Sequence, residues 1–498
     1  MGPSPDGPPA RSRAGLPLAI SLAVAAAAVA AAAEEGAAEP HHWPRARGHH
    51  GGYFLTNETM PQNLSSAFSW SFHNPAGRFT TVMRGSPLFD SQKNVLILTE
   101  GALFKLSPEG RVIWAYQVPT KAMMNVNPCL MGDAVFGMAG DSTVYALDLW
   151  TGRQLWTARY AKDVGGDTSY VDAHEGLLLT AVENSVLYGG GNLRVLGMNA
   201  SSGAMLWEMR IERPTWNFSP MFPGDGSFVF MDVVGGVYRV RHRDGKQLWH
   251  TPVDPQYLWS FTDGGSTVSP DGRMVITCSH RFGDTTGVLR AYRVEDGVRL
   301  WEKLLPTGCT SWPVIAESGD WGVIPAGHFV AKPLVLELPR WMPKTVGLCI
   351  HLFSLYMGPD LRRLPFFDGY IRSVHTEVIA FDTATGETRW SFRTPDWQRF
   401  AAKGDEEGFL PRVLSGASPI CLPTTWGTAT LSGDGTLYVG HVSGLLYALG
   451  DFNGDGRIDP EKEVSTFDMD AAPLPNSPAF APGMMAVASC DTMFVFRK

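Results

Sequence analysis

The sequence predicts an all-β protein, an eight-bladed β-propeller of four-stranded antiparallel blades. The first observation behind this prediction is a repeat: an apolar strand, a turn that usually contains Asp or Gly, and a short strand ending on Trp. The complete copies are residues 103–114, 144–156, 193–207, 237–249, 289–301 and 378–390. Alternation of apolar and polar residues with a period of two marks these strands as half-buried, and the turn makes each pair an antiparallel hairpin.

The spacing of the repeats is the second observation. Units of about 40 to 50 residues are typical of propeller blades, which bury their faces only by stacking on a neighbouring blade. A second strand pair precedes each hairpin, with strands predicted at residues 95–98, 134–138, 177–181, 228–231, 274–278 and 321–325. Degenerate copies at residues 436–449 and 484–496 bring the count to seven complete blades and one incomplete blade.

The two ends of the repeat region predict how the ring closes. Ala67–Phe72 resembles the Trp-bearing outer strand but has no partner before it, whereas the last blade lacks such a strand. Pairing of the two ends would remove the exposed sheet edges. We therefore predict one propeller domain over residues 64–498, closed by the N-terminal strand and the C-terminal blade.

The N-terminal segment predicts export from the cytosol. Two arginines, Arg11 and Arg13, precede an uncharged run over residues 14–33 that ends in small residues. Residues 1–33 therefore form a signal peptide or an uncleaved signal anchor. Either one places the propeller in the secretory pathway, in an extracellular or lumenal location. An uncleaved segment would also anchor it to the membrane.

Residues 34–63 are rich in Ala, Gly, Pro and His and predict a flexible linker. The histidines at positions 41, 42, 49 and 50 offer ligands for a transition metal, but a disordered polar tether is the alternative that we favour. Four glycosylation sequons begin at Asn57, Asn63, Asn199 and Asn217, of which Asn199 lies in a hairpin turn.

Charge and cysteine content limit the function further. The net charge of −8, without a basic stripe, argues against nucleic acid as a partner. Six cysteines in an exported chain indicate disulfides, and we favour a bond between Cys421 and Cys490 because they open and end strands of neighbouring blades.

The repeat also resembles a known family. The pattern V-Y-A-L-D-x-x-T-G-x-x-x-W at residues 144–156, nearly intact at 378–390, is similar to the repeat of the pyrroloquinoline quinone (PQQ) propeller superfamily. That superfamily contains quinoprotein alcohol dehydrogenases and non-catalytic, BamB-like members. The resemblance implies that the Trp of one blade docks on the hairpin of its neighbour. It therefore predicts the fold rather than the chemistry.

A candidate binding site lies where each blade's second strand ends. A polar residue follows that strand in every blade: Glu100, Asp141, Glu183, Asp232, His280, His328, His441 and Asp491. A ring of carboxylates and imidazoles around the axis could hold a cation, PQQ or another polar ligand. The alternative is that these side chains only solvate the loops.

A calcium loop is predicted in the turn of the seventh blade. Its candidate ligands are Asp451, Asn453, Asp455, Arg457, Asp459, Glu461 and Glu463. The oxygens at the first, third, fifth and ninth positions, with Gly456 at the sixth, match an EF-hand-type Ca²⁺ loop. Lys462 departs from the pattern at the twelfth position, so an acidic turn without calcium is the alternative.

Residues 328–371 form an insertion in blade six that resembles no other connection in the chain. Its stretch Val346–Met357 is strongly apolar but too short to span a membrane. It suits a cap packed on the propeller, a surface for a protein partner or a shallow membrane contact.

These observations favour an exported scaffold that mediates protein–protein interaction without catalysis and carries a calcium-stabilised loop. The alternative is a PQQ- and Ca²⁺-dependent alcohol or sugar dehydrogenase, in which the axial ring would bind cofactor and substrate. The chain has no adjacent cysteines, and we find no carboxylate–Asn–Asp set of the kind that the resemblance would imply for an enzyme.

Overall fold

The computed structural model describes residues 41–498, with internal gaps. The gaps are residues 62, 122–124, 166–167, 186–189, 254–259, 262–264, 282–285, 310, 328–342, 344, 347–348, 350–352, 354–372, 400, 422–424 and 476. The predicted signal segment, residues 1–33, lies outside the described residues, as do His328 and most of the insertion.

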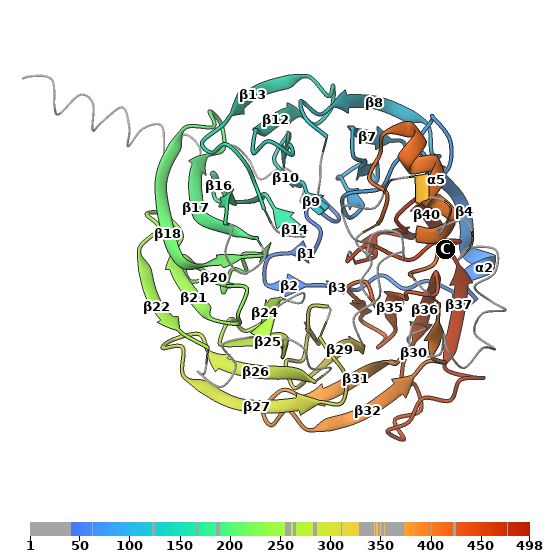
Figure 1. The fold of residues 1–498 in the computed structure, drawn as a ribbon. Helices are drawn as coiled ribbons and strands as arrows, with labels where there is room; N and C mark the ends of the chain where they lie inside the picture. Colours follow the sequence, from blue (N-terminus) through green and yellow to red (C-terminus); the bar gives the residue numbers. More distant parts are fainter. Residues whose placement is uncertain are drawn as a thin grey trace, which may run out of the picture. The chain divides into compact units, whose positions relative to one another are not determined.

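Eight sheets stand around a central axis, which confirms the predicted all-β, eight-bladed propeller (Figure 1). The strands are given from the innermost to the outermost. Blade one contains β5 (Leu88–Phe89), β6 (Val95–Leu98), β7 (Ala102–Leu106) and β8 (Val112–Gln117), and blade two contains β10 (Cys129–Met131), β11 (Ala134–Met138), β12 (Val144–Asp148) and β13 (Gln154–Ala158). Blade three contains β15 (Asp172–His174), β16 (Leu177–Asn184), β17 (Asn192–Asn199) and β18 (Met205–Thr215), and blade four contains β20 (Ser227–Met231), β21 (Val237–Arg241) and β22 (Gln247–Thr251). Blade four has three strands, and an isolated bridge between Met221 and Val229 marks the place of the innermost one.

The second half of the ring repeats this order. Blade five contains β24 (Ser266–Val268), β25 (Met274–Arg281), β26 (Gly287–Arg293) and β27 (Arg299–Leu305), and blade six contains β28 (Val314–Ile315), β29 (Trp321–Gly327), β31 (Thr376–Asp382) and β32 (Thr388–Arg393). Blade seven contains β34 (Thr430–Ser432), β35 (Leu437–Gly440), β36 (Leu445–Leu449) and β37 (Val464–Asp468). Blade eight contains β38 (Ala479–Ala481), β39 (Met484–Ala488), β40 (Thr492–Arg497) and β4 (Phe68–His73). A short strand, β23 (Ser260–Phe261), also pairs with β25.

Small elements connect the blades. β30 (Ser373–Val374) pairs with β33 (Trp397–Gln398), and the parallel strands β9 (Asn125–Asn127), β14 (Thr168–Tyr170) and β19 (Asn217–Phe218) lead into blades two, three and four. Two helices have both ends within the described residues: α2 (Leu64–Ala67) and α5 (Asp405–Ser415).

The ring closes as the sequence predicts. The N-terminal strand β4 pairs antiparallel with β40, and Phe72 lies opposite Met493 in the register. The two strands lie side by side in Figure 1, blue beside red. The last blade therefore obtains its outer strand from the other end of the chain.

The rim of the ring is built from one contact that repeats. In six junctions the indole Nε1 of a hairpin Trp donates to a main-chain carbonyl of the next hairpin, at 2.8 to 3.0 Å; the tryptophans are Trp70, Trp114, Trp156, Trp207, Trp249 and Trp301. The receiving turn has a glycine under the ring. At Gly152, where φ is 69°, an added Cβ would lie 2.7 Å from Trp114.

The hairpin tryptophans differ in exposure. Trp156 and Trp249 are half-buried. Trp114 and Trp390, in contrast, are only 9% and 8% exposed. The indoles join the blades, but they do not form the deepest part of the core.

The structure corrects the prediction of a flexible linker over residues 34–63 from His41 onward. Within that segment, β1 (Gly48–His49), β2 (Gly52–Tyr53) and β3 (Leu55–Thr56) lie at the centre of the ring, and β3 pairs in parallel with β34 (Figure 1). We call residues 41–56 the axial segment. It is polar and rich in glycine, but it folds because the inner strands supply buried partners that composition does not reveal.

The insertion leaves blade six between β29 and β31, which pair directly. The connection between the second and third strands is also the place of the predicted ring residues in the other blades. Of the insertion, the structure describes residues 343, 345, 346, 349 and 353. Among all described residues, no helix is long and apolar enough to cross a membrane.

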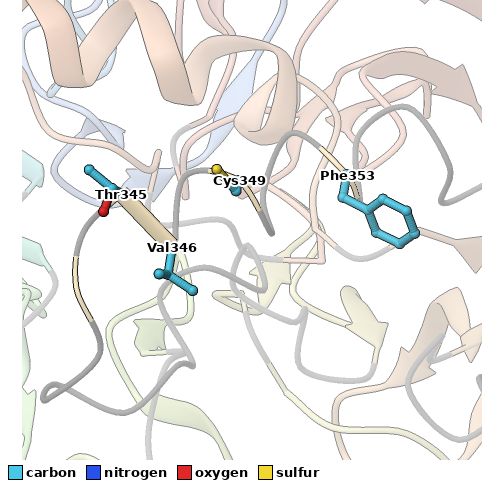
Figure 2. A pocket seen from close by; sticks show the side chains of 4 residues that line it. All are labelled: Thr345, Val346, Cys349 and Phe353. Carbon is cyan, nitrogen blue, oxygen red and sulfur yellow. The ribbon is translucent and has the colours of Figure 1, made fainter.

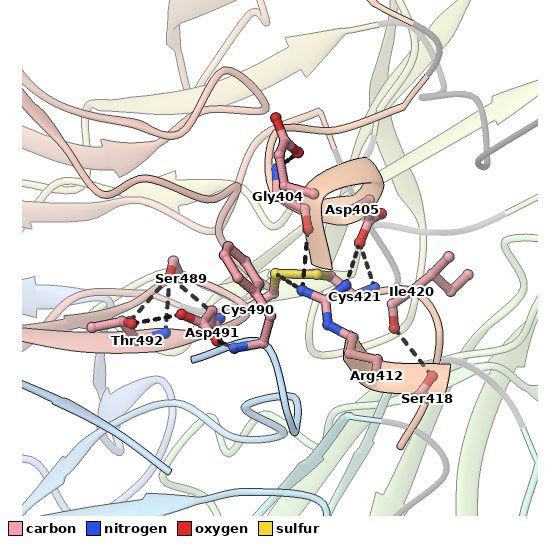
Figure 3. The surroundings of a disulfide bond; sticks show 12 residues. Gly404, Asp405, Arg412, Ser418, Ile420, Cys421, Ser489, Cys490, Asp491 and Thr492 are labelled. Atoms are coloured by element: carbon pink, nitrogen blue, oxygen red, sulfur yellow. Dashed lines mark hydrogen bonds and ion pairs between the residues drawn. A yellow bond between two sulfur atoms is a disulfide. The ribbon is translucent and has the colours of Figure 1, made fainter. Parts of the chain in front are cut away.

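Two disulfides are present. Cys421–Cys490 confirms the predicted pair and joins the end of the α5 region to blade eight (Figure 3). Cys278–Cys309, within blade five and its exit, was not predicted. Of the four sequon asparagines, Asn57 and Asn63 are exposed, Asn199 is half-buried in its turn and Asn217 is buried.

Candidate functional site

Two carboxylates of the predicted axial ring are already paired with arginines. Glu100 is buried, lies 2.9 Å from Arg84 and accepts from the Ser418 amide. Asp491 is buried and lies 2.9 Å from Arg78. Their charges are compensated inside the protein, which leaves little attraction for an additional cation.

Burial disfavours the charged forms of Asp232 and His441. Burial raises the pKa of Asp232 to about 7, although the amides of Gly236 and Val234 donate to its carboxylate. Burial lowers the pKa of His441 to about 3. The His441 ring contacts hydroxyls through both nitrogens, Nε2 with Thr376 at 3.0 Å and Nδ1 with Ser443 at 2.7 Å.

The remaining ring residues also have local partners where they are described. Asp141 lies 3.4 Å from Arg159, and Glu183 lies 2.8 Å from Arg210. The side chains of His280 and His328 fall outside the description. Within the described part of the chain, no hydrogen bond or ion pair joins two of the eight residues. A shared binding site stays a prediction.

The strongest electrostatic cluster lies at the axial segment, and sequence reasoning missed it. Asp172, at the start of β15, is ion-paired with Arg47 and lies 3.1 Å from Arg45, and all three side chains are buried. Burial alone would raise the pKa of Asp172, but the two guanidiniums outweigh it and hold that pKa well below its usual range. Arg47 also donates to the Ser219 hydroxyl at 2.6 Å and to the Pro220 carbonyl at 2.8 Å.

Three histidines extend this cluster. The ring of His50 lies 4.4 Å from that of His174, whose ring lies 5.3 Å from that of His242. Burial, with Arg45 nearby, lowers the pKa of His50 to about 3, and burial lowers the pKa of His242 to about 4. The cluster is therefore neutral at its histidines near pH 7. The arginines and the carboxylate of this cluster are far apart in the sequence, so their spacing gave no signal that they would meet.

The axial segment contacts most of the ring. Its main chain bonds to blade one through Trp43 and Phe89, to blade two through Pro44 and Leu130, and to blade seven through β3. The Ser477 hydroxyl, at the entry to blade eight, donates to the Ala46 carbonyl at 2.6 Å. This segment lies at the axis beside the inner strands, and its buried side chains occupy that region.

Helix α5 covers part of the ring near blades eight and one. Arg412 and Asp405 are fully buried and 3.2 Å apart, and Arg412 Nη2 lies 3.4 Å from the Cys490 sulfur (Figure 3). Burial raises the pKa of Asp405 to about 6. Among the described residues, the group of potential metal ligands that lie close together is Asp405, Cys421 and Cys490. Both cysteines are in the disulfide, so the group holds no thiolate.

The predicted calcium loop lies between β36 and β37, on the rim. Asp451 accepts from the Gly456 amide at 3.0 Å, which draws the first and sixth positions together, and Gly456 has φ of 78°. Glu463 accepts from the amides of Phe452 and Asp459, and Lys462 lies 3.0 Å from Asp459. The backbone thus follows the predicted turn, while the carboxylates bond to loop amides instead of converging on one point.

The described part of the insertion exposes apolar side chains. Thr345, Val346, Cys349 and Phe353 each have a helical backbone conformation, and all four residues are exposed. They line a hollow of about 450 Å³, and the exposed fractions of Val346 and Phe353 are 42% and 53% (Figure 2). Whether the insertion is a cap, a partner surface or a membrane contact stays a prediction.

Comparisons with known proteins support two kinds of relative. The family model of outer membrane protein assembly factor BamB matches residues 140–311. BamB of Yersinia pestis is 21% identical over 435 residues, which cover 84% of this chain and 96% of that protein. Polyvinylalcohol dehydrogenase of Sphingopyxis sp. (strain 113P3) is 25% identical over 297 residues, 53% of this chain and 41% of that protein.

A solved structure shows the same fold. Quinohemoprotein alcohol dehydrogenase from Comamonas testosteroni superimposes with a TM-score of 0.60 at 11% identity, over 95% of this chain and 84% of that chain. The fold and the repeated Trp junctions define an eight-bladed propeller closed through its N-terminal strand. Within that class, residues 140–311 match the BamB family model, and the repeats of this chain are similar to those of BamB.

Proposed function

We propose that this protein is an exported propeller scaffold that binds protein partners and has no catalytic role. The observation that carries the proposal is the axial segment. Arg45, Arg47 and Trp43 are buried there against the inner strands, in the region where a dehydrogenase would need a cofactor pocket. The similarity to BamB, an outer membrane protein assembly factor, supports a role in assembly at the cell envelope.

The proposed contact surface is the apolar face of the insertion. Val346 and Phe353 expose large apolar side chains beside a hollow, and exposed apolar patches of this kind mark interaction sites. A protein partner is the occupant that we propose. Shallow contact with a membrane is the alternative.

Calcium would act on stability in this proposal. The loop from Asp451 to Glu463 stands at the rim, where the regular blades have a short turn that receives a Trp. Ile458 of the loop packs on the core cluster that contains Trp390 of blade six. Calcium in this loop would hold blade seven against blade six. Glycans at the exposed Asn57 and Asn63 are compatible with the fold, whereas one at the buried Asn217 is not.

Two experiments test the proposal. In the first experiment, the full chain and a variant lacking residues 328–371 are used as baits to capture partners from an extract of the cell envelope. A third bait, Val346→Ser together with Phe353→Ser, makes a milder change to the same surface. Loss of the same specific partner from both variants supports the scaffold.

In the second experiment, purified protein reconstituted with PQQ and Ca²⁺ is mixed with alcohols and an artificial electron acceptor. Sustained reduction of the acceptor would favour the dehydrogenase.

A further inference from the structure

A groove on the rim of blade seven is separate from both the insertion and the axial cluster. Its volume is about 480 Å³. One wall is the outgoing N-terminal segment at Met60 and Asn63, and the other wall is the loop between β36 and β37. This volume lies within the range of sites that hold a side chain or a small ligand.

The floor of the groove is apolar and its walls are fixed. Tyr438 and Ala448 are 1% and 5% exposed, and the Tyr438 hydroxyl accepts from the Met60 amide at 3.0 Å. Phe452 stands at the loop side with 42% of its surface exposed. A ligand would therefore meet the exposed ring of Phe452 above a floor that is already packed.

The mouth of the groove is acidic. Three carboxylates line it, those of Asp434, Glu461 and Glu463, against the single ammonium of Lys462. Lys462 lies 3.0 Å from Asp459, and Glu463 accepts from loop amides, so these two charges are engaged.

Two carboxylates retain free acceptor capacity. Asp434 accepts from the Ser432 hydroxyl and from the Thr436 amide with the same oxygen, Oδ1. The Thr436 side chain also hydrogen-bonds to the Asp434 carboxylate. Among the described residues, the Glu461 carboxylate takes no hydrogen bond and forms no ion pair. Both side chains are exposed at the mouth of the groove, where a cation with several donors can reach them.

We propose that this groove binds an arginine side chain from a segment of a partner protein, which rests on the proposed scaffold function. The methylene stem would pack on Tyr438 and Phe452, and the planar guanidinium would donate to Asp434 and Glu461. Arginine suits the site better than lysine because its fork of donors can serve two carboxylates while its plane stacks on an aromatic ring. The acidic mouth disfavours phosphate and nucleic acid.

The test uses the full chain and labelled peptides Ser-Leu-Xaa-Leu-Ser-Gly in which Xaa is arginine, lysine or citrulline. Ligand-observed NMR and fluorescence anisotropy, with EDTA present, measure binding. The arginine peptide should bind at least about tenfold more tightly than the citrulline peptide, since citrulline keeps the shape but lacks the charge. Asp434→Asn with Glu461→Gln should remove that preference, while Glu109→Gln on the rim of blade one should retain it.

Equal binding of the arginine and citrulline peptides, or an unchanged preference in the double variant, would overturn the assignment. Tighter peptide binding by a chain without residues 1–33 would show that the protein's own arginines fill the groove, which also overturns the partner proposal. Self-association that the double variant abolishes would assign the groove to a second copy. If the insertion still captures its partner while the arginine preference is absent, the groove proposal alone has failed.

Discussion

The rim and the axis of this propeller are held together in different ways. At the rim, one indole, one carbonyl and one glycine recur from blade to blade, so each junction resembles the next. At the axis, a single segment makes a different contact with each blade that it meets, through Arg47 with Asp172 or Ala46 with Ser477.

The comparison teaches that repetition and uniqueness serve different purposes. Rim contacts are many and individually replaceable, because each joins two blades through half-buried side chains. The axial contacts are few and fully buried, and a charge left without its partner there has no access to water. We therefore expect axial changes to cost more than rim changes, except where a rim change opens the ring.

Opening the ring should have the largest effect. Deletion of Ala67–Phe72 removes all of β4 except His73, so β40 becomes an exposed edge and the final blade loses its outer strand. The variant should aggregate or melt far below the parent in size-exclusion and thermal unfolding experiments. Ser71→Ala, which changes only an exposed side chain of that strand, should melt like the parent. A deletion variant that remains monomeric and equally stable would contradict closure through β4.

The axial cluster should give the next largest effect. Asp172→Ala leaves Arg45 and Arg47 buried without their carboxylate, and we expect a loss of about 3 to 5 kcal/mol in the free energy of unfolding. Urea denaturation measures it. Asp244→Ala, on an exposed hairpin turn, is the matched control and should leave the transition in place. If both variants unfold at the same urea concentration as the parent, the axis contributes no more than the surface.

A rim junction should cost less. Trp156→Ala removes a half-buried indole and its hydrogen bond to the Ala200 carbonyl, with an expected loss of about 3 kcal/mol. Trp156→Phe keeps an aromatic ring and loses the hydrogen bond, so about 1 kcal/mol should disappear. Urea denaturation again measures both. A stable Trp156→Ala protein that no longer binds its partner would make the indole a binding contact.

Acid should weaken the fold through its buried histidines. Because the folded pKa values of His50 and His242 are about 3 and 4, the unfolded chain binds protons near pH 6.5 that the folded chain excludes. The free energy of unfolding should fall as the pH drops from about 6.5 to 4, by about 1.4 kcal/mol per pH unit for each excluded proton.

Other groups titrate in the same window with the opposite sign. The raised pKa values of Asp232 and Asp405, about 7 and 6, stabilise the fold at low pH and lose that contribution as the pH rises through them. The informative measurement is therefore the slope of His50→Gln relative to the parent, which should be shallower. The exposed His73→Gln is the control. An identical slope in His50→Gln would remove that histidine from the acid response.

Calcium should have the smallest effect. With Lys462 at the twelfth position, we expect a dissociation constant of about 10⁻⁴ to 10⁻³ M, so 10 mM Ca²⁺ stabilises by about 1.4 kcal/mol at the weak end of that range. Thermal unfolding with and without Ca²⁺ measures it. Asp451→Ala together with Asp455→Ala should abolish the response, and Lys462→Glu should strengthen it. No calcium heat in calorimetry at millimolar concentration would leave an acidic turn.

The sequence by itself determined the rim. Strand alternation, Trp spacing and the turn residues are local signals, and each rim hairpin forms between segments close in the chain, so the eight blades could be counted before the structure was known. Closure by the strand at Trp70 also followed, because an unpaired strand at one end matched a missing strand at the other. The Cys421–Cys490 bond followed from the order of neighbouring blades.

Only the tertiary structure decided the axis. The partners of Arg47 lie more than a hundred residues away, at Asp172 and Ser219, and no local pattern announces them. The same holds for Glu100, which looked like part of a shared ring but is neutralised by Arg84 and capped by the amide of Ser418. Composition describes what a segment can do alone, whereas burial and charge pairing depend on which distant strands the closed ring brings to the centre.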